Sequence, residues 1–261
     1  MKHKLAFFYI FAFAISWILW YFMYLRYTEV GVMDMIVFAL SIGGAGPIIS
    51  LAILEKLSKR EIDVGDILDT IRLKDTQMRW FVITISAYPL ILFAGNLMNY
   101  VFGSETQFQL IKPDVASLGV LILPVMLIHF CASLITSPFF EEPGWRGYAL
   151  VNLQEKFGKE GGSLVVGVLW WIWHQPMNLT FGLLPTVYSF LLMMTYSFMI
   201  DSLFNLSDRN LLIAMFAHQS VGTAFIFIYA GYENLFTLFL LISFVIMLRF
   251  QEHRNEKRSA V

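Results

Sequence analysis

The sequence predicts an all-α, polytopic membrane protein with about eight transmembrane helices and both termini in the cytoplasm. Three observations support this fold class. Hydrophobic residues make up 58% of the 261 residues and charged residues only 14%, whereas soluble domains are about 25% charged. Apolar segments recur along the chain, each about 20 residues long, which is the length that crosses a bilayer core of about 30 Å. The basic residues between these segments fall almost entirely on one side of the predicted membrane.

The ends of the predicted transmembrane segments are approximate. The segments are residues 5–25, 32–54, 80–102, 117–139, 161–177, 183–204, 210–230 and 232–250. The first, LAFFYIFAFAISWILWYFMY, is apolar on every face, as a helix surrounded by lipid should be. Ala12-Phe13-Ala14 resembles a signal-peptidase site, but only about seven apolar residues precede it and the apolar run continues past it. We therefore expect a retained first transmembrane helix.

The distribution of positive charge sets the orientation. An even number of spans places both termini on the same side of the membrane. Every lysine and arginine except Arg26 and Lys112 then lies on that side. Because cytoplasmic loops carry such an excess of basic residues, we expect both termini to be cytoplasmic. A miscounted span would have scrambled this asymmetry, so the charges also support the count of eight.

Small and polar residues predict further local features. SIGGAGPIIS, Ser41–Ser50, places glycines and Pro47 within the second span, where small residues allow close helix contact or a kink. Ser163 and Gly167 form a similar small pair on the fifth span. The most polar segment, 55–79, carries apolar residues at near-helical spacing, and we expect it to form an amphipathic helix on the cytoplasmic surface.

Ionisable residues within or beside the spans are the candidates for function, because such residues are costly in a membrane. They are the pair Glu141-Glu142 with Arg146, and the histidines His129, His174 and His218. His218 lies about 12 Å and His174 about 20 Å into their spans at 1.5 Å per residue. Pro138 and Pro143 are expected to break regular helix on both sides of the glutamates. A further helix of about four turns is expected over residues 144–158.

Spacing separates the two glutamates. Glu142 and Arg146 are four residues apart, so on a helix they share a face and can form an ion pair. Glu141 has no obvious cation in the sequence. Burial without such a partner raises the pKa of a carboxyl group toward the range useful to a general base. The alternative is that both glutamates merely favour a helix N-terminus at Pro143. For His129 we expect a packed histidine that is hydrogen-bonded to a neighbour.

The strings EEPGWRGYAL, WWIWHQP and AHQS closely resemble motifs of the CPBP family, the CAAX-protease and bacteriocin-processing enzymes, also called Abi membrane proteases. The family signature has three elements: Glu-Glu-x-x-x-Arg, then an aromatic residue four positions before a histidine (aromatic-x-x-x-His), then His-x-x-x-Asn. Glu141 to Arg146 match the first element in full. Trp170 and His174 match the second, with tryptophan in the usual place of phenylalanine.

The resemblance implies a protease that cleaves peptide bonds in or near the membrane. By this likeness Glu141 is the base, His174 helps to hold the attacking water, and His218 stabilises the tetrahedral intermediate. Glu142 and Arg146 would be a supporting pair. The third motif is incomplete, because Gly222 stands where the family has asparagine. The other donors that could replace this asparagine are Gln219, Ser220 and Asn178.

The resemblance also bears on cofactors and partners. Glu141, His174 and His218 are an acceptable zinc set, but the sequence has no His-Glu-x-x-His, and the implied mechanism needs no metal. We therefore expect hydrolysis without a cofactor, with a divalent metal such as zinc as the alternative. The expected partners are a hydrophobic or membrane-associated peptide and the lipid bilayer. The net charge of −1 gives no reason to expect nucleic acid.

The expected organisation follows from the extent of the resemblance. Residues 1–115 hold the N-terminal transmembrane helices, 116–228 the protease core, and 229–261 the last transmembrane helix with a basic cytoplasmic tail. We expect a multi-pass protein of the cell membrane, in particular of a bacterial plasma membrane. Two other functions stay open: a non-proteolytic membrane scaffold or bacteriocin self-immunity protein, which Gly222 favours, and a small secondary transporter, which would favour duplicated halves.

Overall fold

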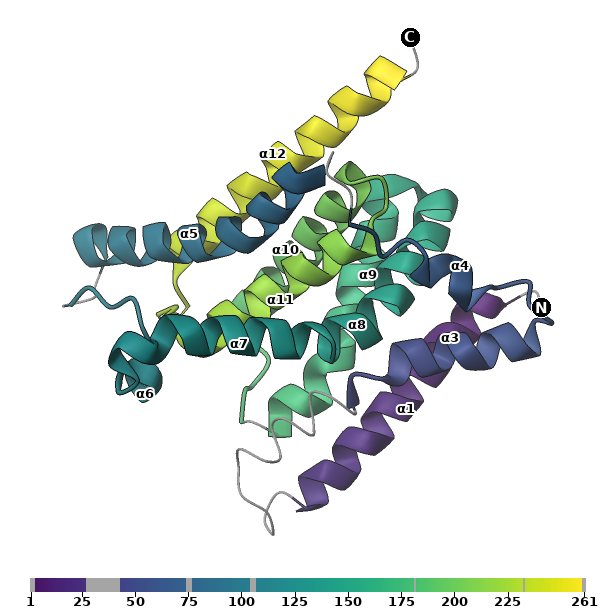
Figure 1. Cartoon of the computed structure of the whole chain (residues 1–261), viewed down its shortest axis with the longest axis horizontal. Helices are drawn as coiled ribbons and strands as arrows, with labels where there is room; N and C mark the ends of the chain where they lie inside the picture. Colours follow the sequence, from purple (N-terminus) through teal and green to yellow (C-terminus); the bar gives the residue numbers. More distant parts are fainter. Residues whose placement is uncertain are drawn as a thin grey trace. The chain divides into compact units, whose positions relative to one another are not determined.

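Figure 1 shows the computed structural model, which describes residues 3–26, 43–73, 77–103, 107–180, 182–231 and 233–259. Helices dominate these residues, and the extended pairing among them is an isolated bridge between Ile111 and Ile228. The prediction of an all-α protein is therefore confirmed. The chain divides into two compact units, Met1–Arg72 with Ile135–Thr186 (unit 1) and Leu73–Leu134 with Val187–Val261 (unit 2).

The helices have the lengths that a polytopic membrane protein requires. Five helical stretches among the described residues are long and apolar enough to cross a membrane. They are Lys4–Phe22, Met78–Phe102, Gly119–Leu179, Val187–Leu206 and Leu235–Arg258. The third stretch includes most of the predicted span 117–139 and all of 161–177. The span predicted at 210–230 corresponds to a shorter apolar helix, Leu211–Phe227.

Unit 1 carries the N-terminal helices and the glutamate motif. Its elements are α1 (Lys4–Arg26), α3 (Gly46–Leu57), α4 (Val64–Leu68), α8 (Ser137–Glu142), the π-helix η4 (Pro143–Leu150) and α9 (Val151–Thr180). Helix α1 packs against α3 and α9, while α3 also packs against α8 and η4. Of the predicted second span, 32–54, residues 32–42 lie outside the described residues, and the remainder contributes to α3.

Small residues bring α1 and α3 close together. A Cβ atom added at Gly46 would lie 2.5 Å from the carbonyl oxygen of Ala12, a separation that real Cβ atoms do not reach. Near the same crossing, the hydroxyl of Ser50 donates to the carbonyl oxygen of Phe8 over 2.8 Å. The close helix contact predicted for SIGGAGPIIS is therefore confirmed at Gly46.

The prediction of a surface helix over 55–79 is wrong for the part of this segment that the structure describes. Helix α3 ends at Leu57, and Lys59 and Arg60 then adopt left-handed backbone angles, with φ of 53° and 65°. The next helix, α4, has only five residues, and the Asp63 side chain caps it by accepting from the amide of Asp66. Helix α4 packs against α3 and η4 within unit 1.

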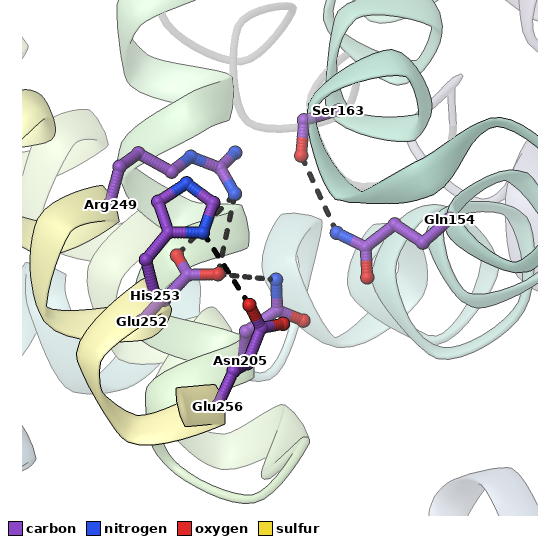
Figure 2. A network of polar contacts seen from close by, with 7 residues as sticks. All are labelled: Gln154, Ser163, Asn205, Arg249, Glu252, His253 and Glu256. Atoms are coloured by element: carbon purple, nitrogen blue, oxygen red, sulfur yellow. Dashed lines mark hydrogen bonds and ion pairs between the residues drawn. The ribbon is translucent and has the colours of Figure 1, made fainter. Parts of the chain in front are cut away.

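Helix α9 consists of two parts that meet at Gly158. This residue has φ of 74° and ψ of 170°, which ends regular helix there. The amide of Gln154 before the turn lies so close to Gly162 that a Cβ there would be 2.6 Å away. Figure 2 shows the Gln154 side chain donating to Ser163 Oγ over 3.5 Å. The predicted break between residues 158 and 161 is therefore confirmed, whereas the helical segment before it begins at Ser137 rather than at residue 144.

Unit 2 holds the remaining helices. They are α5 (Met78–Phe102), α6 (Pro113–Ala116), the short η3 (Gly119–Leu121), α7 (Ile122–Leu134), α10 (Val187–Leu206), α11 (Leu211–Phe227) and α12 (Leu235–Ser259). Helix α11 packs against α5, α7 and α10, and α12 packs against α5 and α10. Figure 2 shows a polar contact between the last pair, in which Asn205 donates to Glu252, itself paired with Arg249.

Candidate active site

Glu141 is placed by the short helix α8. The chain leaves helical geometry at Thr136 (φ −111°, ψ −97°), and α8 then starts with Pro138 in its first turn. The predicted break before the glutamates is thus confirmed. Ser137, one turn before Glu141, donates from its hydroxyl to Glu141 Oε1 over 2.5 Å. The Glu141 side chain is buried, with the residue 3% exposed.

Pro143 does not end the helix, which corrects the sequence prediction at this point. The chain continues from α8 into the π-helix η4. Proline has no amide hydrogen and its ring clashes with the carbonyl four residues earlier. A wider π-turn skips that bond, and such turns occur often at functional sites. The continuous helical backbone keeps Glu142 and Arg146 on one face.

The predicted ion pair is present and fully buried. Arg146 Nη1 lies 3.1 Å from Glu142 Oε1, and both side chains have no exposed surface. The guanidinium carbon of Arg146 also lies 4.9 Å from the centre of the Trp170 ring. Charge neutralisation of this kind is what a buried carboxylate requires. Glu142 therefore fits the supporting role rather than that of the reacting base.

The second part of α9 brings Trp170 and His174 to the same cluster. Trp170 Nε1 donates to Glu141 Oε2 over 3.2 Å. His174 Nδ1 lies 2.8 Å from the carbonyl oxygen of Trp170. Because a carbonyl only accepts, Nδ1 must carry the hydrogen, and in the neutral ring Nε2 is then the nitrogen that accepts. The His174 ring stands perpendicular to those of Trp170 and Trp173, at 4.8 and 4.7 Å between ring centres.

Unit 2 carries the third histidine. His218 lies on α11 and is half-buried, with Gly222 one turn further along the same face. A Cβ atom added at Gly222 would have Gln219 Oε1, at 4.0 Å, as its nearest neighbour, so the position has room for a side chain. The positions of the two units relative to one another are not defined, and each part of the site is therefore described within its own unit.

The three alternative donors have different surroundings. Gln219 Nε2 donates to Thr223 Oγ1 over 3.0 Å, and one of its two amide hydrogens can serve this bond. The hydroxyl of Ser220 donates to the carbonyl of Ile85 on α5 over 3.3 Å. Asn178 follows His174 by one turn of α9 and is half-buried.

His129 is a packed histidine, as predicted. Its Nδ1 and Nε2 lie 3.3 Å from the hydroxyls of Thr223 and Ser133, respectively. Its ring meets that of Phe227 edge-on, at 5.6 Å between centres. These contacts within unit 2 account for a histidine in an apolar span.

Neither unit by itself contains all three residues considered as zinc ligands. Glu141 and His174 of unit 1 are two of the three residues considered for zinc, and His218 belongs to unit 2. Among the described residues of either unit, no three His, Cys, Asp or Glu side chains gather as ligands around one ion. Within unit 1, moreover, Glu141 Oε1 and Oε2 both accept hydrogen bonds from protein donors.

Sequence reasoning missed Ser137 and the indole N–H of Trp170. The spacing of Ser137 and Glu141, four residues apart, was a usable signal, because such residues share a helix face. Trp170 stands 29 residues from Glu141, and only the turn at Gly158 brings the two together.

Comparisons with known proteins cover the part of the chain that holds these residues. Residues 121–224 match the model of a family described as type II CAAX prenyl endopeptidase, Rce1-like. CAAX prenyl protease 2 of Methanococcus maripaludis is 26% identical over 181 residues, covering 67% of this chain and 63% of that protein. Lysostaphin resistance protein A of Staphylococcus haemolyticus is 27% identical over 143 residues, covering 54% of this chain and 37% of that protein. The chain thus spans less than two thirds of the length of either relative.

Proposed function

We propose that this chain is a multi-pass membrane endopeptidase whose base is Glu141, because residues 121–224 match the family described as type II CAAX prenyl endopeptidase, Rce1-like, and a CAAX prenyl protease is 26% identical to the chain. The observation that carries the proposal is the buried cluster in unit 1, where Glu141 and His174 are both held by Trp170. Arg146 neutralises the charge of Glu142 in a buried ion pair. We therefore assign Glu141 the role of base and Glu142 a supporting role.

The proposed reaction is hydrolysis by an activated water. Glu141 takes a proton from a water molecule that also donates toward His174 Nε2, and the water oxygen attacks the carbonyl carbon of the peptide. His218 donates to the resulting oxyanion, since preorganised donors in a dry site stabilise developing charge. Breakdown of the tetrahedral intermediate cleaves the C–N bond, and the proton on Glu141 moves to the departing amine. Water thus supplies the hydroxyl of the new carboxylic acid and the hydrogen of the new amine.

The proposed substrate is a hydrophobic or lipid-modified peptide presented at the cytoplasmic half of the membrane. The apolar helices of both units support a site that is reached from the bilayer. The name of the methanococcal relative adds a specific candidate, a C-terminal CAAX sequence whose cysteine carries a prenyl group.

The decisive experiment is peptide cleavage by the purified chain in phospholipid vesicles. The substrates are a farnesylated CAAX peptide, the same peptide without the farnesyl group, and a peptide tethered by a transmembrane segment. Glu141→Ala should abolish cleavage, while Glu155→Ala, on the exposed face of α9, serves as the matched control and should retain it. Cleavage by Glu141→Ala at the wild-type rate would exclude Glu141 as the base.

Zinc is the alternative to metal-free activation: Glu141, His174 and His218 would hold it, and it would supply a Lewis acid for the water and the carbonyl. Exhaustive chelation separates the two. Cleavage that survives chelation supports the metal-free step, whereas a loss that added zinc restores supports the alternative.

A second candidate function is a non-proteolytic role in self-immunity or scaffolding. Gly222 favours it, because glycine offers no side-chain donor for an oxyanion, and one relative bears the name lysostaphin resistance protein A. This function predicts that cells expressing Glu141→Ala keep the wild-type resistance to a cell-wall-degrading bacteriocin. Loss of resistance in that variant would favour the protease.

A further inference from the structure

Trp170 contacts three polar residues of the cluster in unit 1. Its indole N–H donates to Glu141, its carbonyl accepts from His174 Nδ1, and its ring lies against the Arg146 guanidinium. The residue itself is 3% exposed. A phenylalanine, the residue usual at this place in the motif, would keep the ring and the carbonyl. It would lose the N–H, so the bond to Glu141 is particular to tryptophan.

The carboxylate of Glu141 is held at both of its oxygens. Ser137 donates to Oε1 over 2.5 Å from one turn earlier on α8, and Trp170 donates to Oε2 over 3.2 Å from α9. A carboxylate held at one oxygen can still rotate about its terminal bond, whereas two donors from separate elements fix its plane. Each oxygen has about two lone-pair sites, and these two bonds use one site on each oxygen.

We propose that Trp170 and Ser137 are positioning residues, which hold the carboxylate plane of Glu141 in the orientation that proton abstraction requires. The catalytic part of this inference rests on the proposed function, and the structural part does not. Misplacement of a reacting group by about 1 Å can cost about 10²-fold in rate. Loss of either donor should therefore lower kcat and leave KM unchanged, because an interaction that matters only in the transition state affects kcat alone.

The structural part is tested by NMR of the full chain in detergent. Selective ¹⁵N labelling of the indoles yields one N–H signal for each of the seven tryptophans, and Trp170→Phe identifies the signal of Trp170. In Glu141→Ala this signal should move upfield, because its acceptor is removed, while the signal of Trp171 should stay. An unmoved Trp170 signal would overturn the inference whether or not the protein is a protease.

The catalytic part is tested by cleavage kinetics. Trp170→Phe should lower kcat by about 10- to 100-fold, while Trp171→Phe removes an indole N–H from a helix position turned by about 100° and should cleave normally. Ser137→Ala should lower kcat in the same way, and Ser137→Thr, which keeps the hydroxyl, should restore it. A normal kcat in both Trp170→Phe and Ser137→Ala would overturn the positioning role.

The two proposals fail in different ways. If the wild-type chain cleaves no peptide but the Trp170 signal responds to Glu141→Ala, the held carboxylate is confirmed and the protease function is wrong. If the wild-type chain cleaves, and both Trp170→Phe and Ser137→Ala are as active as the wild type, the protease function stands and the positioning inference is wrong.

Discussion

At the residue scale, Glu141 and Glu142 are neighbours with different partners because a helix turns successive side chains by about 100°. Glu142 faces Arg146 one turn ahead, while Glu141 faces Ser137 one turn behind and Trp170 on α9. Spacing alone predicted the first of these relations correctly. The partners of the two glutamates are therefore set by position on the helix, not by residue type.

The buried pair of Glu142 and Arg146 should be important for stability. Arg146→Met leaves the Glu142 carboxylate without this cation in a fully buried position, and breaking such a pair costs about 3–5 kcal/mol. We expect a corresponding drop in the free energy of unfolding, measured by denaturant titration in detergent. The double variant Glu142→Gln with Arg146→Met should lose less than Arg146→Met alone. Equal losses in the two variants would show that the uncompensated charge is not the cause.

Gly222 offers a gain-of-function test. The added Cβ would meet nothing closer than Gln219 Oε1 at 4.0 Å, so Gly222→Asn should fold and present an amide one turn after His218. One oxyanion donor is typically worth about 10²- to 10³-fold in kcat. We expect Gly222→Asn to cleave faster than Gly222→Ala, which adds a Cβ but no donor. Equal kcat values for the two variants would mean that another group already serves the oxyanion.

At the element scale, the π-helix η4 is held in place by close contact with α1 and α3. A Cβ atom added at Gly144 would lie 2.6 Å from Pro47 Cβ and 3.0 Å from Phe8 Cζ. The proline ring is rigid and cannot turn aside. Glycine at this place therefore allows the backbone that carries Arg146 to approach both helices.

Gly144→Ala should accordingly destabilise unit 1. Overpacking of this kind costs about 1–3 kcal/mol, and we expect a lower midpoint of thermal unfolding in detergent. Gly222→Ala is the matched control, since it adds the same methyl group to a helix position with open space and should stabilise the helix by about 0.5–1 kcal/mol. An unchanged midpoint in Gly144→Ala would show that η4 shifts to accommodate the methyl group.

Sequence patterns predicted the elements of this protein better than the contacts between them. Apolar length predicted the long helices, and the small residues around Gly46 predicted a close helix crossing. The prediction of one helix in the segment 55–79 was wrong although the apolar spacing is compatible with a helix. The left-handed backbone at Lys59 and the cap that Asp63 forms on α4 divide the segment. The bond from Trp170 to Glu141 depends on the turn at Gly158, and no local pattern encodes it.

At the scale of the whole molecule, charge asymmetry predicts how the chain is oriented in a membrane. The loops predicted to be cytoplasmic hold all lysines and arginines but Arg26 and Lys112. Lys112 precedes α6, and its pKa is lowered because the side chain is partly desolvated. The charge distribution therefore predicts that both termini are cytoplasmic.

The predicted orientation can be measured with single cysteines, because Cys131 is the only native one. In a Cys131→Ala background, cysteines replace Lys56, Asp114 or Arg254, three exposed residues. If both termini are cytoplasmic, a membrane-impermeant maleimide added to intact cells should label Asp114→Cys alone. Lys56→Cys and Arg254→Cys should react only after permeabilisation, which also controls for buried thiols. Labelling of Arg254→Cys but not Lys56→Cys in intact cells would mean that an odd number of spans separates the two, and the count of eight would be wrong.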